Sequence, residues 1–351
     1  MKVLIIRLSS MGDVIHTLPA VTDAAKNISN IEFHWVIEKD FSSIPSWHNS
    51  VSRVIPVELR QFKNNLFSGR KYFRDLITHL RKEKYDLIID SQGLIKSMIL
   101  AVCCHGKVAG YSKHSAREPI ASIGYKYKYN ISHNQHAISK NRELFSKCLG
   151  YSINNHRNSI DYGINPAINT EIEQKDYLIF LHGTTWASKC WPFEKWLALA
   201  KIADKDGIEV QVTYATQQQK NRAIKLASLA SNVKIKDHMG LNDAATWISN
   251  AKAIISVDTG FGHLAAAFNK PVVGLFGPTK TALTGILGND KCVYLFSTIR
   301  HCAPCLQKKC PLLTSKNIGS LCMNDHSPVE VWDALCKKLN AFNNHHVIIA
   351  S

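Results

Sequence analysis

Two segments far apart in this chain place reactive side chains where an apolar strand pattern gives way to a helix pattern. Near the start, the apolar run 3–6 is followed by the small polar segment 9–13, which carries the carboxylate of Asp13. The segment 257–263 repeats this order of strand, glycine-containing loop and helix. Ligands of open α/β sheets bind beyond the carboxyl ends of the parallel strands, where a carboxylate can act as a base. The alternative interpretation is that Asp13 only caps its helix, a position that favours Asp.

Three loops in the second half have the composition of a diphosphate cradle. They are residues 182–189, 258–263 and 277–279. The first offers hydroxyls and the cation Lys189, and the second lies just before a helix, whose N-terminus favours phosphate. Each loop alone would more often be an ordinary turn. All three in order, at predicted strand ends, are much harder to obtain by chance.

Strand and helix patterns alternate along both halves, which is typical of βαβ units around a parallel sheet. The predicted strands are 3–7, 32–37, 53–57, 87–90 and 107–110, then 177–181, 208–214, 233–235, 253–257 and 272–276. The predicted helices of the first half lie near 14–26, 70–83, 94–104 and 136–149. The fold class is therefore α/β.

The length of 351 residues predicts two domains, because one core rarely keeps growing to that size. We expect a first domain over 1–153, a polar linker over 154–176 and a second domain over 177–327. Residues 328–351 are expected to form a C-terminal helix, over about 328–339, and a tail, packing back on the first domain.

The formal charge of +16 favours a polyanionic partner, such as nucleic acid, an anionic membrane surface or a phosphorylated substrate. No helix-turn-helix, zinc-finger or RNP-like pattern accompanies the charge, so we expect no nucleic-acid partner. The apolar run after Lys2 is interrupted by Arg7, and no segment approaches the ~20 apolar residues of a spanning helix. We expect a cytoplasmic protein that touches a membrane surface.

Four of the ten cysteines form a cluster, namely Cys302, Cys305, Cys310 and Cys322. Four thiolates can build a structural zinc site, but only one CxxC pair is present and the spacing fits no standard knuckle. A disulfide is not expected in a reducing cytosol. No other ligand set is evident, so we predict neither a metal nor a cofactor.

Several longer segments match one known family. They are SSMGDVIHTLPA, VIEKDFSSIPSWH, DSQGLIKS, AREPIAS, HGTTWASKCWP, VDTGFGHLAAA and the GPT that follows. With these segments in order over about the whole chain, the sequence resembles the lipopolysaccharide heptosyltransferases of the GT-B type, in glycosyltransferase family 9. SIPSWH and AREPIAS favour the members that add the first heptose over those that add the second. The resemblance implies two Rossmann-like domains whose parallel sheets face each other across a cleft.

The resemblance also implies a reaction, the inverting transfer of L-glycero-D-manno-heptose from ADP-heptose to a Kdo residue of Kdo2-lipid A. Asp13 would be the general base that removes the proton of the acceptor hydroxyl. Lys189, with Thr184 and Thr185, would hold the diphosphate and stabilise the charge that develops on the leaving ADP.

Further donor contacts are implied in the second domain. Thr259 and Gly260 would donate helix-terminal N–H groups, and Asp258 would face the donor sugar or its phosphate. His263 would contact a donor phosphate or satisfy the loop backbone, and we favour the second. Met239 would lie beside the adenine, or serve as a flexible filler of the core.

One stretch departs from the family pattern. After the strand that ends at Tyr214 the family has a glycine and acidic residues, one of which binds the nucleotide ribose, but residues 215–221 here read ATQQQKN. Gln219 can still bond to a ribose hydroxyl as a neutral amide. The affinity for the donor and the choice of nucleotide are therefore open.

Basic side chains of the first domain are the expected acceptor contacts. Arg60 and Lys63 lie in a basic stretch over 60–74, and Arg117 lies in AREPIAS. The guanidinium of Arg117 can hold a Kdo carboxylate with two hydrogen bonds. The anionic inner leaflet would attract the same basic residues. The alternative for the stretch 60–74 is a solvated basic helix face.

Other functions stay open. One is another heptosyltransferase, which adds the second heptose. A sugar-nucleotide epimerase would share the diphosphate cradle but needs no basic acceptor surface. A basic nucleic-acid-binding protein would explain the charge but leaves Asp13 and Lys189 without a role. A glycosyltransferase uses both the cradle and the charge, and we expect it to act as a monomer.

Overall fold

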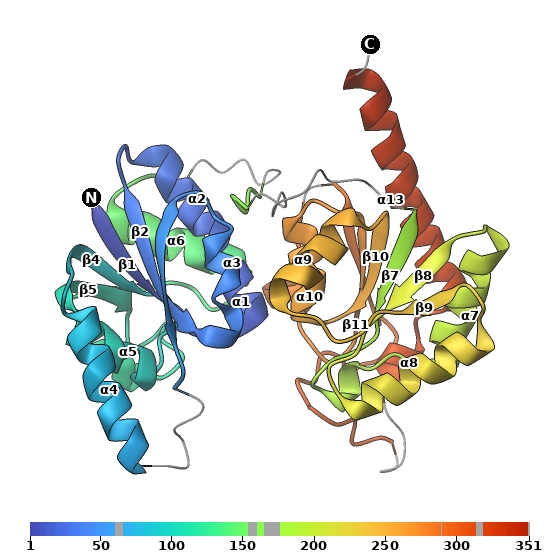
Figure 1. Cartoon of the computed structure of the whole chain (residues 1–351), viewed down its shortest axis with the longest axis horizontal. Coiled ribbons are helices and arrows are strands. Elements are labelled where there is room, and N and C mark those ends of the chain that lie inside the picture. Colours follow the sequence, from blue (N-terminus) through green and yellow to red (C-terminus); the bar gives the residue numbers. More distant parts are fainter. Residues whose placement is uncertain (60–65, 154–159, 165–175, 289, 314–318, 350–351) are drawn as a thin grey trace. The chain divides into compact units, whose positions relative to one another are not determined.

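The computed structural model describes residues 1–59, 66–153, 160–164, 176–288, 290–313 and 319–349 (Figure 1). The chain divides into two compact units. Unit 1 comprises Met1–Arg157 with Asp161–Asn165, and unit 2 comprises Asn158–Ile160 with Pro166–Ser351. Most of the predicted linker lies outside the described residues, so its boundaries stay predictions.

Unit 1 is built on a six-stranded parallel sheet in the order β3-β2-β1-β4-β5-β6. Its strands are β1 (Lys2–Ile6), β2 (Glu32–Glu38), β3 (Val51–Val57), β4 (Lys84–Asp90), β5 (His105–Tyr111) and β6 (Tyr127–Tyr129). The central strand β1 is buried along Val3–Ile6, as its continuous apolar sequence predicts for a strand covered on both faces.

The helices of unit 1 cover both faces of this sheet (Figure 1). They are α1 (Met11–Ile15), α2 (Leu18–Asn27), η1 (Lys39–Phe41), α3 (Ser43–Ser46), α4 (Leu66–Leu80), α5 (Ile95–Cys103), η3 (Pro119–Gly124) and α6 (Ala137–Leu149). Leu80 of α4, Leu100 of α5 and Ala121 of η3 share one buried cluster with the strands. The helices α2 and α6 pack on each other, and Phe145 of α6 lies against Phe33 of β2.

Unit 2 repeats the plan with a six-stranded parallel sheet in the order β12-β11-β10-β7-β8-β9. Its strands are β7 (Tyr177–Leu181), β8 (Glu209–Val212), β9 (Val233–Ile235), β10 (Ala253–Val257), β11 (Val272–Phe276) and β12 (Cys292–Phe296). Its helices are η4 (Ala187–Lys189), α7 (Phe193–Lys205), α8 (Gln217–Leu229), α9 (Leu241–Asn250), α10 (Gly260–Ala267), α11 (Thr281–Thr284), α12 (Leu321–Asn324) and α13 (Pro328–Ile349). The prediction of an α/β fold with two parallel sheets is confirmed.

The helix α13 packs on unit 2. Its side chains Val331, Trp332 and Leu335 belong to the buried cluster that α7, β10 and β11 also line. The helix is longer than the expected span of 328–339. The predicted packing of residues 328–351 onto the first domain stays a prediction.

Three elements differ from the sequence-based expectation. The helix expected over 14–26 is two helices, α1 and α2, separated by His16 and Thr17. The edge strands β6 and β12 were not predicted. The strand β6 is short and mostly exposed, whereas β12 is a continuous apolar run whose residues are half-buried or exposed. Since α1 begins at Met11, Asp13 lies inside the first helical turn.

The described residues contain no helix that combines the length and the hydropathy needed to cross a membrane.

Candidate active site

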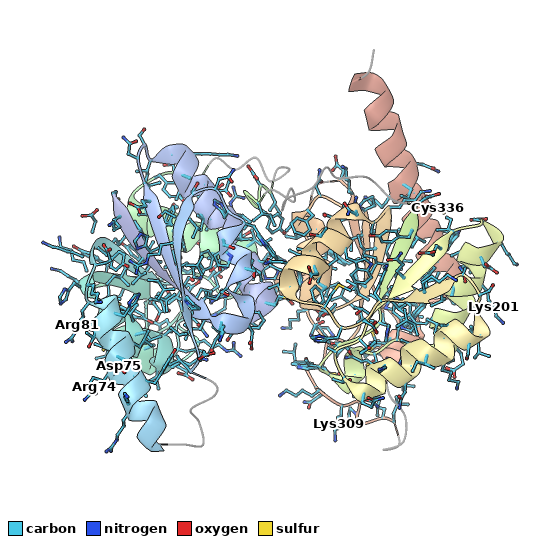
Figure 2. All side chains as sticks on the ribbon, in the orientation of Figure 1. Arg74, Asp75, Arg81, Lys201, Lys309 and Cys336 are labelled. Atoms are coloured by element: carbon cyan, nitrogen blue, oxygen red, sulfur yellow. The ribbon has the colours of Figure 1, made fainter. Side chains whose placement is uncertain are left out.

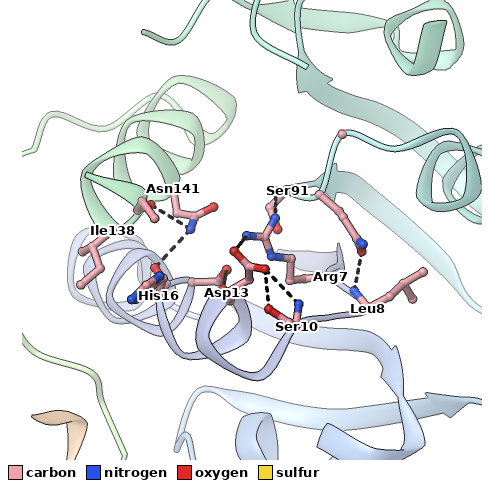
Figure 3. Close-up of polar contacts among 12 residues, drawn as sticks. Arg7, Leu8, Ser10, Asp13, His16, Ser91, Ile138 and Asn141 are labelled. Atoms are coloured by element: carbon pink, nitrogen blue, oxygen red, sulfur yellow. Dashed lines mark hydrogen bonds and ion pairs between the residues drawn. The ribbon is translucent and has the colours of Figure 1, made fainter. Parts of the chain in front are cut away.

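Asp13 lies in the first turn of α1, just after β1, with its carboxylate held from two sides (Figure 3). Oδ2 accepts hydrogen bonds from the Ser10 backbone N–H at 3.0 Å and from Ser10 Oγ at 2.8 Å. Arg7 Nη2 is 3.4 Å from Oδ1. Asp13 therefore does cap its helix. Its side chain nevertheless stays 34% exposed, so a substrate can still reach it.

The surroundings of Asp13 keep its carboxylate ionised. Burial raises the pKa of this group, but the Arg7 guanidinium, the two Ser10 bonds and the charge of Arg117 together hold that pKa below its usual value. Arg7 is itself buried and donates from Nη1 to the carbonyl of Ser91, beyond the end of β4. A carboxylate that is charged at neutral pH has the protonation state that a general base requires.

The segment α1 is anchored to the rest of unit 1. Asn141 of α6 donates from Nδ2 to the carbonyl of His16 at 3.2 Å, just past the end of α1 (Figure 3). Arg7 and Asn141 thus fix the two ends of the short turn that carries Asp13.

Arg117 lies on the segment between β5 and η3, against the turn that follows β4. Gly93 in that turn has a φ of +69°, and a Cβ added there would lie 3.3 Å from the Arg117 backbone N. Glu118 accepts a 2.7 Å hydrogen bond from the Ile95 N–H at the start of α5. Arg117 itself is exposed, and its charge lowers the pKa of Asp13. An anion held by Arg117 would therefore lie within electrostatic range of the carboxylate.

Asp90 organises the DSQGLIKS segment instead of facing solvent. The fully buried carboxylate accepts hydrogen bonds of 2.7–3.1 Å from four donors, the N–H groups of Gln92 and Gly93 and the hydroxyls of Ser97 and Tyr125. Burial raises its pKa. This network shapes the turn on which Arg117 packs.

In unit 2, Asp258 connects the three predicted cradle loops. Its Oδ2 is 2.7 Å from Lys189 Nζ and accepts a 2.7 Å hydrogen bond from Thr279 Oγ1. Its Oδ1 is 3.9 Å from His263 Nε2, and its carbonyl accepts from Thr184 Oγ1 at 3.3 Å. The loops after β7, β10 and β11 therefore lie together at the carboxyl edge of this sheet.

The Lys189–Asp258 ion pair is largely removed from water, with side chains 15% and 10% exposed. Burial raises the pKa of Asp258, but the hydrogen bond from His263 and the Lys189 ammonium outweigh it and lower the pKa to about 2. Lys189 Nζ also lies 4.4 Å from the ring centroid of Trp186. An ammonium has three N–H donors, so Lys189 can hold a phosphate oxygen as well as Asp258.

The helix α10 begins directly after Asp258, with Thr259 as its N-cap and Gly260 as its first residue. N–H groups in a first helical turn have no partner within the helix and favour an anion. Gly262 lets this turn approach the sheet, because a Cβ added there would lie 2.6 Å from Ser256 Oγ. The N-terminus of α10 is thereby fixed beside the ion pair.

The remaining predicted donor residues lie on loops or in a first helical turn at the same edge of unit 2. Gln219, in the first turn of α8, covers Gly183, and its Oε1 accepts from the Ala215 N–H at 2.8 Å. Thr185 is exposed in the loop after β7, and Met239 is half-buried in the loop between β9 and α9. The structure thus brings Gln219 against the loop that also carries Thr184.

Of the predicted acceptor residues, Arg117 is described, whereas Arg60 and Lys63 lie outside the described residues. Further along that basic stretch, Arg74 of α4 is 76% exposed, with its Nε 3.8 Å from Asp75 Oδ1 (Figure 2). The described end of the stretch is therefore a solvated helix face.

Two contacts were not predicted from the sequence. The sequence feature that could have revealed the contact of Arg7 is its place directly after an apolar strand, because a charge that is buried there needs a partner. Thr279 lies in the GPT segment of the predicted cradle, but its bond to Asp258 spans 21 residues of chain.

No group of three or more His, Cys, Asp or Glu side chains within the described ranges is placed to hold a metal ion. The clustered cysteines also differ in burial, since Cys302 is exposed, Cys305 and Cys310 are half-buried, and Cys322 is buried.

The two units define the class of this protein. Two parallel sheets, one in each unit, together with the match to solved heptosyltransferase structures, are the architecture of a GT-B glycosyltransferase. The model of glycosyltransferase family 9 (heptosyltransferase) matches residues 73–316, and the chain belongs to this family. The choice of a glycosyltransferase over an epimerase or a nucleic-acid-binding protein is confirmed.

Relatives within the family match most of the chain. It is 42% identical over 315 residues to lipopolysaccharide heptosyltransferase 1 of Pseudomonas aeruginosa, covering 88% of this chain and 87% of that protein. It is 41% identical over 301 residues to the protein of that name from Escherichia coli strain K12, covering 84% and 93%. The solved structure of E. coli heptosyltransferase WaaC with ADP has a TM-score of 0.79 and 39% identity, covering 84% of this chain and 92% of that one.

Proposed function

We propose that this glycosyltransferase moves L-glycero-D-manno-heptose from ADP-heptose to a Kdo residue of Kdo2-lipid A, with inversion at the anomeric carbon. The observation that carries the proposal is the identity of 42% and 41% to two proteins named lipopolysaccharide heptosyltransferase 1. The related structures with ADP and with ADP-2-deoxy-2-fluoro heptose support an ADP-sugar as the donor.

Asp13 is the general base in this proposal. Its carboxylate takes the proton of the acceptor hydroxyl as that oxygen attacks the anomeric carbon. The bond from the anomeric carbon to the ADP oxygen breaks on the opposite face, so ADP leaves and the configuration inverts. The low pKa and partial exposure of Asp13 support this role, because the base is charged and reachable at neutral pH.

Arg117, which is close enough to affect that pKa, holds a carboxylate of the acceptor. Arg60 and Lys63 are proposed to add acceptor contacts.

The cradle in unit 2 holds the diphosphate of the donor. Lys189 and the hydroxyls of Thr184 and Thr185 bind its oxygens, and the first turn of α10 at Thr259 and Gly260 adds N–H donors. These groups stabilise the charge that grows on the leaving ADP.

The other side chains of this edge position the cradle or bind the nucleoside. Asp258 acts as a positioning residue, because its carboxylate already holds Lys189 and Thr279. His263 supports Asp258 from within α10. Gln219 binds the ribose, for which its Nε2 group is a donor, and Met239 packs beside the adenine.

The setting proposed for the reaction is the cytoplasmic face of the inner membrane, where a monomer with a charge of +16 meets an anionic surface. The proposal includes no cofactor, metal or nucleic-acid partner.

The test follows ADP release from ADP-heptose with purified Kdo2-lipid A, comparing wild type with Asp13→Asn. The amide keeps the size of the side chain and can still accept the Ser10 bonds, so folding should be preserved. We expect release to require the acceptor and kcat to fall by about 10²–10⁴ in the variant. The control is Asp75→Asn, an exposed carboxylate on α4 that should leave the rate unchanged.

Two outcomes would overturn the proposal. Release of ADP without acceptor would indicate a hydrolase or epimerase. Transfer only to an acceptor that already carries one heptose would instead indicate the enzyme for the second heptose.

A further inference from the structure

Unit 1 exposes its large apolar side chains in one region. Apart from Met1, the large apolar side chains of unit 1 that are exposed all lie between residues 95 and 127, among those whose burial is described. Soluble proteins rarely gather such side chains without a partner, and an apolar patch rimmed by polar residues marks an interaction site. The packing of unit 1 does not explain why its exposed apolar side chains gather in one region.

Five of these exposed side chains lie on two neighbouring elements, and the sixth, Tyr127, lies on β6. On α5, Ile95, Ile99 and Val102 recur at positions i, i+4 and i+7, which places them on one face of the helix. On η3, Ile120 is 59% exposed and Ile123 is 75% exposed. We call these five side chains the α5–η3 patch.

The two elements pack directly against each other. A Cβ added to Gly124, at the end of η3, would lie 2.9 Å from Val102 Cγ1 and 2.6 Å from Met98 Cγ. The opposite side of α5 is buried, since Leu100 and Ala101 belong to the buried cluster that α5 shares with the sheet. The α5–η3 patch is therefore the outward face of a rigid pair of elements.

The stretch of sequence that contains the patch is strongly positive. Between residues 93 and 130 the sequence has the cations Lys96, Lys107, Lys113, Arg117, Lys126 and Lys128. The one carboxylate in that span, Glu118, already accepts the hydrogen bond of the Ile95 N–H at 2.7 Å. Lys96, Lys126 and Lys128 are exposed next to the apolar side chains in the sequence.

Apolar side chains with a rim of cations fit one partner better than others. A second copy of this chain would bring two positive rims together, which is repulsive. A bilayer that contains anionic phospholipids offers acyl chains for the isoleucines and phosphate groups for the lysines at the same time. A neutral protein surface would satisfy only the apolar part.

The patch also adjoins the acceptor side of unit 1. Ile120 and Ile123 lie three and six residues after Arg117, whose charge lowers the pKa of Asp13. A lipid acceptor that stays in the membrane would therefore present its sugar close to the candidate base when the patch rests on the bilayer.

We propose that the α5–η3 patch is the membrane-docking surface of this protein, with Ile120 and Ile123 entering the interface of an anionic bilayer and the surrounding lysines contacting lipid phosphates. The inference rests on the proposed function in one respect, because the reason for docking would be to reach a lipid-anchored acceptor. It does not depend on that function for its test, because docking can be measured without donor or acceptor.

The experiment measures cosedimentation of the full chain with vesicles of phosphatidylcholine, with and without phosphatidylglycerol. We expect binding to the anionic vesicles and much weaker binding to phosphatidylcholine alone. The double variant Ile120→Asp/Ile123→Asp should bind the anionic vesicles about tenfold more weakly or worse, since it removes the inserted apolar area. The variant Lys126→Ala/Lys128→Ala should lose about fivefold per cation, and only with the anionic vesicles.

A matched control separates the patch from general surface effects. Ile224 and Leu229 of α8 in unit 2 are each 49% exposed, so Ile224→Asp/Leu229→Asp changes apolar exposure to a similar degree elsewhere. We expect this variant to bind vesicles like wild type. All variants alter exposed side chains, so their melting temperatures should match wild type.

Three results would overturn the proposal: wild type that does not bind anionic vesicles, a patch variant that binds as tightly as wild type, or a control variant that loses as much. A wild-type dimer that the patch variant converts to a monomer would identify a second copy as the occupant.

Activity then distinguishes docking from the proposed function. The patch variant should transfer heptose poorly to an acceptor in vesicles but normally to a soluble acceptor without acyl chains. Vesicle binding without any transfer would contradict the proposed function alone.

Discussion

Asp13 combines a structural and a proposed chemical task in one side chain. One oxygen caps α1 through Ser10, while the other lies against Arg7. The folded protein lowers the pKa of this carboxylate, so the charged form stabilises the fold above the unfolded pKa near 3.8. That contribution is lost as the pH falls through the lower folded pKa.

Arg7 should set the acid limb of the pH–rate profile. Arg7→Gln removes the nearest cation, so the pKa of Asp13 should rise and the acid limb of kcat/KM should move to higher pH. The control is Arg142→Gln, because Arg142 pairs with Asp23 elsewhere in unit 1 and should not move the limb. An acid limb that is the same in wild type and Arg7→Gln would contradict either the tuning by Arg7 or the role of Asp13 as base.

Lys189 should affect stability and donor binding in separable ways. Lys189→Met leaves Asp258 buried without its cation, and breaking a buried ion pair from one side costs about 3–5 kcal/mol of unfolding free energy. The double variant Lys189→Met/Asp258→Asn removes both charges and should recover most of that loss. Denaturant unfolding measures both effects.

Donor affinity should not recover with stability. If Lys189 binds the diphosphate, ADP should bind about 10- to 100-fold more weakly in both variants, the loss expected for a charge-assisted hydrogen bond. Calorimetry measures this affinity. Normal ADP binding by the stable double variant would restrict Lys189 to a structural task.

The sequence was most informative at the residues where motif and strand end coincide. Asp13, Lys189 and Asp258 could be selected because each follows an apolar strand pattern at the edge where ligands bind. Their partners could not be selected in the same way. Arg7 reaches Ser91 across 84 residues of chain, and Thr279 reaches Asp258 across 21, so these contacts appear only in the folded protein.

At the scale of elements, the close packing of α10 on β10 fixes the proposed phosphate donors. Gly262→Ala should destabilise unit 2 by about 1–3 kcal/mol, because the new Cβ would lie 2.6 Å from Ser256 Oγ and 3.0 Å from Ile286 Cδ1. It should also weaken ADP binding by displacing the first turn of α10. Thermal unfolding with and without ADP measures both effects.

A glycine at another helix start provides the control for this prediction. Gly240, the N-cap of α9, has only Asp243 Oδ2 near the position of an added Cβ, at 3.6 Å. Serine is a favoured N-cap, so Gly240→Ser should stay within about 0.5 kcal/mol of wild type. An equal loss in both variants would show that the tight approach at Gly262 does not matter.

The predictability of elements followed their burial. The central strands β1 and β7 were found because their apolar runs are continuous, as expected for strands covered on both faces. The edge strand β6 lacks that pattern and was missed. The edge strand β12 was missed although its five residues are all apolar. The break between α1 and α2 was also missed. The sequence does carry a signal for it, because Pro19 lies in the first turn of α2, where proline is favoured.

At the scale of the whole molecule, each unit has its own buried cluster and its own set of polar strand-end residues. The loops predicted to hold the donor belong to unit 2, and Asp13 and Arg117 belong to unit 1. The family resemblance predicted that donor and acceptor bind in different domains, whereas chain length alone indicated only that there are two domains. A ligand that binds to one unit should therefore stabilise that unit alone.

ADP alone should protect unit 2 and leave unit 1 unchanged in hydrogen exchange. At about 100 times its Kd, a ligand that binds only the folded state stabilises by about 2.7 kcal/mol, which slows exchange where it binds. We expect protection in the segments 182–189, 258–263 and 277–279, and none at 10–16 or 91–97. AMP lacks the second phosphate of ADP. It should protect less, because Lys189 and the first turn of α10 would have one phosphate fewer to bind. Protection at 10–16 with ADP alone would contradict the assignment of the nucleotide to unit 2, and equal protection by AMP would contradict the diphosphate cradle.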